Sequence, residues 1–111
     1  MTVRLNILAG GALALSVLAF GIPSPGAEPR VHEIVIDKLA FGPAPEALHV
    51  NNTVEWVNAD IFRHTVTATN GSFDVDLPAG AKGRTILKRA SVVDYFCRFH
   101  PGMKGRLEVA P

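Results

Sequence analysis

The stretch VVDYFCRFHPGMKGRLEV, residues 92–109, contains the only cysteine of this 111-residue chain. It begins as a short run rich in β-branched and aromatic residues, passes through a loop marked by Pro and Gly, and ends in a second such run. That composition is typical of two β-strands joined by a turn. The loop also gathers a thiol, an imidazole and a thioether within seven residues, at Cys97, His100 and Met103.

The loop itself has the composition of a tight turn. Between His100 and Met103, Pro stands second and Gly third, which is the sequence preference of a type II β-turn. Such a turn holds its first and last Cα atoms within about 7 Å. Singly, a Cys or a Met usually fills core space, and a His beside a Pro can simply decorate a loop. Their joint placement around a compacting turn favours a metal site with Cys97 at its base.

Outside this stretch, the chain also reads as β-structure. Turn signals rich in Gly, Pro and Asn separate short apolar or alternating runs, and no segment has a sustained helical period. We therefore predict an all-β fold, a Greek-key sandwich of seven to eight strands, with Trp56 in its core. The runs expected to form strands span residues 31–37, 47–50, 53–58, 64–69, 84–88, 92–96 and 106–109.

The N-terminus differs in composition from the rest of the chain. After Arg4, an uninterrupted apolar run extends from Ile7 to Ile22 and leads into the small-residue stretch PSPGA. This run is short for a membrane span, which needs roughly 20 residues. It is typical of a secretory signal peptide covering residues 1–27, with cleavage after Gly26 or Ala27. An uncleaved membrane anchor is the alternative.

The expected mature domain, residues 28–111, is electrically neutral. Its 84 residues carry ten Lys and Arg against ten Asp and Glu, since Arg4 is the only charged residue before them. This balance argues against nucleic acid or anionic lipid as a bulk electrostatic partner. With Cys97 alone no intramolecular disulfide can form, so a metal is the expected staple of such a small exported domain.

The four histidines differ in context. His32 lies near the expected mature N-terminus and His49 just before a turn, so both are predicted to be solvated or structural. His64 follows a bend and starts a predicted strand, which allows a neighbouring strand to bring it to the end of the sandwich that holds Cys97. Two imidazoles, one thiolate and one weak thioether form the ligand set of a blue-copper site.

These residues resemble the cupredoxin, or type 1 blue copper, family. The resemblance rests on one upstream His, followed by Cys-x-x-His-x-x-Met after a strand that ends in an aromatic residue. The two-residue gap between the later His and the Met is similar to that of the amicyanins, whereas plastocyanins and pseudoazurins have a longer gap. FGPAPEALHVNNTVEWVNAD (residues 41–60) resembles the family's opening strands and RLEVAP (residues 106–111) its last strand.

The resemblance implies a function and a ligand set. His64, Cys97 and His100 would be the equatorial ligands of one copper ion, and Met103 the weak axial ligand. Because thiolate and thioether favour Cu(I) while imidazole also suits Cu(II), the set serves both oxidation states. The expected function is one-electron transfer between redox proteins in the periplasm, by a monomer that is not itself an enzyme.

Thr65 is a departure from the family pattern. Amicyanin-like proteins usually have Asn directly after the upstream His, where it helps to join the two ligand loops. We expect the Thr65 hydroxyl to join them less extensively, while its backbone N–H still donates to the Cys97 sulfur. Because such outer hydrogen bonds tune redox potential, the potential cannot be taken from relatives.

The family resemblance also implies where a partner docks. The later His would show one edge at an apolar surface, made here by Phe99, Pro101 and Met103 around His100. We hypothesise that a basic rim steers an acidic redox partner toward it; the alternative is that the rim holds ordinary solvated charges. The rim residues are Arg63, Arg98, Lys104 and Arg106.

Other functions fit the sequence less well. A periplasmic copper carrier or sequestration protein would use the same ligands, and the sequence does not separate it sharply from an electron carrier. Structural zinc sites rarely recruit Met. A Cys97–His100 hydrolase lacks an evident orienting residue and oxyanion site. The glycosylation-like triplets at Asn51 and Asn70 are better explained as turns, since Asn tolerates positive φ and Asn-Gly favours a hairpin.

Overall fold

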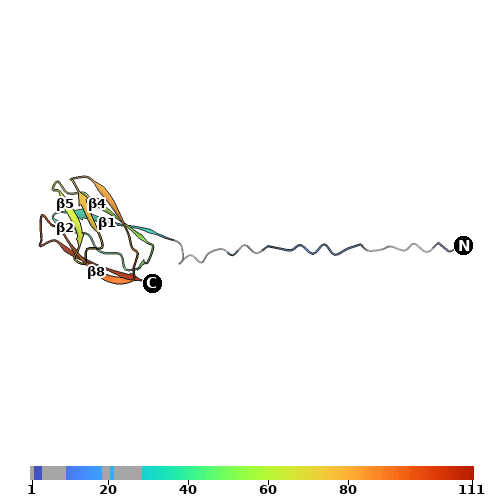
Figure 1. Cartoon of the computed structure of the whole chain (residues 1–111). Coiled ribbons are helices and arrows are strands. Elements are labelled where there is room, and N and C mark those ends of the chain that lie inside the picture. Colours follow the sequence, from blue (N-terminus) through green and yellow to red (C-terminus); the bar gives the residue numbers. More distant parts are fainter. Residues whose placement is uncertain (1, 4–9, 19–20, 22–28) are drawn as a thin grey trace.

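The protein is a two-sheet β-sandwich. The computed structural model describes residues 2–3, 10–18, 21 and 29–111. The described residues form nine strands, β1 (Val31–Asp37), β2 (Ala40–Phe41), β3 (Leu48–His49), β4 (Thr53–Asn58), β5 (His64–Ala68), β6 (Asp74–Leu77), β7 (Lys82–Ile86), β8 (Ser91–Phe96) and β9 (Lys104–Ala110). These strands form two sheets (Figure 1). The four-stranded sheet has the order β2-β1-β4-β7, and the five-stranded sheet has the order β3-β9-β8-β5-β6.

Alternation along the strands creates the core between the two sheets. In β1, Ile34 and Ile36 are buried while the residues on either side of them are exposed, as expected for a strand with one solvated face. Strands β8 and β9 alternate in the same way. Trp56 is fully buried at the centre, with its ring 5.1 Å from that of Tyr95, and its indole N–H donates to the hydroxyl of Thr85. The predicted sandwich and the core position of Trp56 are confirmed.

Several strand boundaries differ from the prediction. The described residues contain nine strands rather than seven or eight, because two-residue β2 and the unpredicted β6 are added. Two Asp residues conceal β6 in the sequence, since Asp is depleted in strands. The strand predicted at 84–88 is β7 (Lys82–Ile86), which pairs with β4 only as far as Ile86.

The two Asn-containing triplets form turns, as predicted. Asn51 has a φ of 72°, in the left-handed region that Asn tolerates. Gly71 has a φ of 78° in the hairpin between β5 and β6, where the amide of Ser72 donates to the Asn70 side chain. Both segments therefore have a structural reason to contain Asn.

The predicted signal peptide falls largely on residues that the structure does not describe, including the expected cleavage site at Gly26 or Ala27. The described positions of this segment, residues 2–3, 10–18 and 21, are exposed and carry no regular secondary structure. In the described part of the chain, no helix is long and apolar enough to cross a membrane.

The topology brings distant residues to one end of the sandwich. Strands β5 and β8 are antiparallel, with Thr67 opposite Phe96, so the first residue of β5 and the residue that follows β8 extend toward the same end. These two residues are His64 and Cys97. The C-terminus lies at the opposite end, where β1 begins, and Val50 donates a backbone hydrogen bond to Ala110 there (Figure 1).

Candidate metal centre

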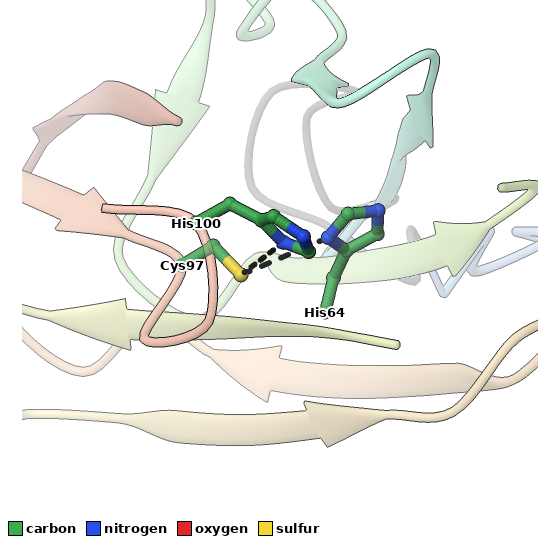
Figure 2. Close-up of side chains that lie close together, drawn as sticks. All are labelled: His64, Cys97 and His100. Atoms are coloured by element: carbon green, nitrogen blue, oxygen red, sulfur yellow. Dashed lines mark hydrogen bonds between the residues drawn. The ribbon is translucent and has the colours of Figure 1, made fainter. Parts of the chain in front are cut away.

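Three metal-binding side chains converge at this end of the sandwich. The donor atoms of His64, Cys97 and His100 all lie within 4.8 Å of one another. Each Nδ1 is 3.7 Å from the Cys97 Sγ, and Figure 2 shows both rings directed toward the sulfur. His64 and Cys97 are fully buried, whereas His100 is half-buried. The spatial convergence expected from the sequence is therefore present.

The spacing of the donors fits one metal ion. Nitrogen and thiolate ligands lie roughly 2.0–2.3 Å from a transition metal. Two such ligands at a trigonal or tetrahedral angle are separated by about 3.7 Å, which is the separation of each imidazole nitrogen from the sulfur. The mixture of imidazole and thiolate is the donor set of a type 1 copper site. In the described residues no other group of His, Cys, Asp and Glu side chains meets in this way.

The ligand loop is closed by backbone hydrogen bonds. The amide of Met103 donates to the His100 carbonyl over 2.8 Å, and the amide of Cys97 donates to the Met103 carbonyl over 3.2 Å. The predicted tight turn therefore forms, but its predicted type is wrong. A type II turn requires a positive φ at Gly102, and Gly102 is not among the residues with positive φ. Gly102 is exposed with open space around it, so no packing contact demands glycine there.

Met103 lies beneath the loop. Its side chain is buried, and it belongs to the hydrophobic core cluster together with Cys97 and Leu107. Its backbone is tied to both Cys97 and His100, which places the residue next to the converging donors. The role of its sulfur as an axial ligand stays a prediction.

Hydrogen bonds from its surroundings activate the Cys97 thiol. Burial alone would raise the pKa of Cys97, but the Thr65 N–H, at 3.4 Å from the sulfur, and the imidazole of His100 lower the pKa to about 6. A thiol with such a pKa is mostly thiolate at neutral pH, and the thiolate is the form that binds metals. The Cys97 side chain is therefore in a form that can bind a metal ion.

The side chain of Thr65, as well as its backbone, joins the segment that contains His64 to the segment that contains Cys97. Its hydroxyl oxygen accepts a hydrogen bond from the amide of Arg98, directly after Cys97, over 2.9 Å. The same hydroxyl is 2.9 Å from the hydroxyl of Thr67. Thr65 is fully buried, and both contacts are partly buried. The expected amide contact to the sulfur and the side-chain tie between the segments are both present.

Asp60, which the sequence did not indicate, contacts the side of His64 that faces away from Cys97. Its carboxylate lies 2.9 Å from His64 Nε2, on the opposite side of the ring from the nitrogen that faces Cys97. An acidic residue four positions before the upstream His was the available signal. It was missed because four-residue spacing in a loop does not imply contact.

His100 sits in an apolar surface. Its ring is 6.0 Å from that of Phe62 and 5.0 Å from that of His64. Phe62 and Phe99 are about half exposed, and Ile61 is 82% exposed. The predicted patch therefore gains Ile61 and Phe62 from the loop before β5, but loses Met103, which is buried.

The arginines of the predicted basic rim are paired with aspartates. Each contact is an exposed ion pair, and such pairs leave little net charge on the surface. The guanidinium groups of Arg63 and Arg98 also lie 5.6 and 5.9 Å from the centre of the Phe99 ring. The pairs are Arg63–Asp76, Arg98–Asp74 and Arg106–Asp94.

The two remaining histidines lie apart from this centre. His32 Nε2 is 3.2 Å from the Asn52 side chain, and His49 Nδ1 is 3.0 Å from the carbonyl of Pro111. Neither joins a metal-binding group among the described residues. Both have structural partners, as the sequence predicted.

Known structures share this architecture, although no protein-family model matches the chain and no curated protein matches its sequence. A purple cupredoxin from Nitrosopumilus maritimus has a TM-score of 0.63 and 24% identity, over 70% of this chain and 98% of its own. Amicyanin from Paracoccus versutus has a TM-score of 0.62 and 25% identity, over 76% of this chain and 83% of its own. A Cu-containing nitrite reductase from Thermus scotoductus SA-01 has a TM-score of 0.66 and 25% identity, over 76% of this chain but only 23% of its own.

The sandwich and these neighbours show that the chain has a cupredoxin fold, and the convergent His-Cys-His group supports its resemblance to the cupredoxin family. Among proteins of this fold it resembles amicyanin, as the spacing of His100 and Met103 predicted. The nitrite reductase is much longer, so this chain corresponds to only one part of it.

Proposed function

We propose that this protein is an exported one-electron carrier that holds a single copper ion through His64, Cys97, His100 and Met103. The observation that carries the proposal is the convergence of two imidazole nitrogens on one buried sulfur, 3.7 Å from each. Bound copper would supply a Cu(I)/Cu(II) couple that gains and loses one electron. The three nearer donors would be its equatorial ligands, and the Met103 thioether its weak axial ligand.

The surrounding residues support electron transfer by limiting rearrangement. His64 and Cys97 are fully buried, and the ligand loop is closed by two backbone hydrogen bonds. Thr65 ties the segment containing His64 to the segment after Cys97. Ligands fixed in this way keep their positions when the charge of the site changes, and water is kept away from the buried donors.

His100 is the proposed exit and entry point for the electron. It is the one half-buried member of the group, and it lies among the exposed side chains of Ile61, Phe62 and Phe99. An apolar surface of this kind suits a transient contact with a redox protein. The partner would be a dehydrogenase, a cytochrome or a terminal reductase.

The expected signal peptide places this carrier in the periplasm. We propose cleavage after Gly26 or Ala27, which releases residues 28–111 as a monomeric blue copper domain without enzymatic activity of its own. The neutral charge of that domain gives it no bulk attraction to membranes or nucleic acids.

Retention of copper separates an electron carrier from a copper carrier. The copper-loaded domain is reduced and reoxidised repeatedly in the presence of a competing Cu(I) chelator. We expect the metal to stay bound in both states through many cycles, because four donors saturate the site. Rapid loss of Cu(I) to the chelator within one cycle would favour a copper-delivery or sequestration role instead.

Met103 requires a separate test. Met103→Leu keeps an apolar side chain of similar size in the core but removes the sulfur. If Met103 is the axial ligand, the reduction potential and the visible spectrum change while the domain remains folded. An unchanged potential and spectrum would show that Met103 only fills core space.

A further inference from the structure

The Asp60 carboxylate contacts His64 on the side of its ring that faces away from Cys97. One of its oxygens lies 2.9 Å from His64 Nε2 and also accepts the amide N–H of Leu39 over 2.9 Å. The other oxygen accepts the amide N–H of Ile61 over 2.8 Å. The Asp60 side chain is only 7% exposed and that of His64 is fully buried. Asp60 is therefore an almost dehydrated anion in contact with a metal-binding ring.

This contact determines which nitrogen of His64 carries the proton. Backbone N–H groups of Leu39 and Ile61 already donate to the two oxygens of the Asp60 carboxylate, so Asp60 acts as an acceptor toward the imidazole. The neutral imidazole must then be protonated at Nε2. Its Nδ1 keeps a free lone pair, and Nδ1 is the atom that faces the Cys97 sulfur.

The position of Asp60 is itself fixed by neighbouring residues. Asn58 is fully buried; its side-chain oxygen accepts the Asp60 amide, and its amide group donates to the carbonyls of Phe62 and Leu77. On the other side, Leu39 adopts a φ of 58° in the turn between β1 and β2, which aims its N–H at the carboxylate. Such a backbone conformation is uncommon for Leu. Two elements thus hold Asp60 against His64.

We propose that Asp60 is a positioning residue of the metal centre, which holds His64 in the Nε2-protonated tautomer and adds a fixed negative charge beside the bound ion. This inference rests on the proposed copper function. Cu(II), one thiolate and one carboxylate sum to zero charge, whereas Cu(I) leaves the same group with one excess negative charge. Because a buried charge is poorly screened, Asp60 stabilises Cu(II) relative to Cu(I) and lowers the reduction potential.

Replacement of the charge alone tests the electrostatic part. Asp60→Asn retains an oxygen that accepts from His64 but removes the negative charge. We expect the ratio of Cu(I) to Cu(II) affinity to rise tenfold or more, and each tenfold step raises the potential by about 59 mV. Asp76→Asn is the matched control, since it removes the same formal charge from an exposed carboxylate near the same end. A shift in Asp60→Asn no larger than that of the control would overturn the electrostatic role.

Nuclear magnetic resonance of the metal-free protein tests the tautomer without copper. At about pH 8 the ring nitrogen shifts of His64 should show a proton on Nε2 and none on Nδ1. In Asp60→Ala we expect the two tautomers to mix. A wild-type His64 protonated on Nδ1 would overturn the positioning role, even if Asp60→Asn failed to fold. If copper gave no blue site in the wild type, the proposed function would fail. The NMR measurement on the metal-free protein would still test whether Asp60 sets the His64 tautomer.

Discussion

The backbone N–H of Thr65 donates to the Sγ of Cys97 over 3.4 Å, although 32 positions separate the two residues in the chain. The hydroxyl of the same Thr65 accepts the amide of Arg98, so one residue holds the upstream ligand segment against the downstream one. The family resemblance led us to expect Asn at this position, and Thr65 replaces it with a hydroxyl that hydrogen-bonds to the downstream segment.

Removal of the Thr65 hydroxyl should destabilise the metal-free domain. Thr65→Val keeps the shape of the side chain and the backbone contact to sulfur, but leaves the partly buried amide of Arg98 without its acceptor. We expect the free energy of unfolding to fall by about 1–3 kcal/mol, the usual cost of an unsatisfied buried group. Thr65→Ser, which retains the hydroxyl, should lose less. Equal denaturation midpoints for Thr65→Val and wild type would contradict this role.

Two glycines near the site should respond differently to substitution by Ala. A Cβ on Gly105 would lie 2.3 Å from atoms of the Tyr95 ring, which is itself packed 4.9 Å from the ring of Phe41. We expect Gly105→Ala to cost about 1–3 kcal/mol, as overpacked cores do. A Cβ on Gly102 meets nothing within 4 Å, and its φ is not positive. Thermal unfolding of Gly102→Ala should stay close to wild type, and a large loss there would show that the turn requires glycine.

The Cys97 thiol should titrate unusually low in the metal-free protein. We expect its thiolate absorbance to appear with a midpoint near pH 6, in agreement with the pKa of about 6 that the Thr65 amide and the His100 imidazole produce against the effect of burial. In denaturant, the midpoint should return to about 8.5. A folded-state midpoint at or above 8.5 would contradict the hydrogen-bonded site.

The same shift makes stability depend on pH. Because the folded pKa of Cys97 is lower than the unfolded one, folding favours the thiolate. Its contribution to the free energy of unfolding is complete above about pH 8.5, declines as the pH falls, and is absent below about pH 6. The stability difference between metal-free wild type and Cys97→Ser should therefore widen from pH 6 to pH 8.5.

Paired charges at the metal end should weaken electrostatic steering. Arg63 and Arg98 are neutralised by Asp76 and Asp74, so we expect the rate of electron exchange with ferricyanide, a small anionic oxidant, to vary little with salt. The double variant Asp74→Asn/Asp76→Asn removes the carboxylates that pair with Arg98 and Arg63. Its rate should be higher at low salt and fall as salt is added. A steep salt dependence in the wild type would instead support the basic rim.

The sequence was most informative where a pattern is local. Alternation along β1 and β4 follows from one-sided burial, and the positions of Trp56 and Cys97 follow from strands that the composition identifies. Two members of the candidate metal centre were predictable because Cys97 and His100 lie within one loop. Only the inclusion of His64 needed a tertiary argument, which the antiparallel β5 and β8 supply.

The sequence was least informative where long-range contacts determine the local structure. Strand β6 is stabilised in part by ion pairs from Asp74 and Asp76 to arginines outside it, which no local propensity reveals. Asp60 contacts His64 because Asn58 and the distant Leu39 hold the loop in place. The turn at Gly102 took another type than Pro-Gly prefers. These features depend on backbone geometry that forms only in the folded chain.

The visible spectrum of the copper-loaded domain tests the central claim most directly. One equivalent of Cu(II) should produce an intense thiolate-to-copper band that reductant bleaches reversibly and that is absent in Cys97→Ala. His64→Ala should lose or strongly alter the band, because the three donors share one ion in this account. A colourless wild-type protein, or a band that persists in both variants, would contradict it.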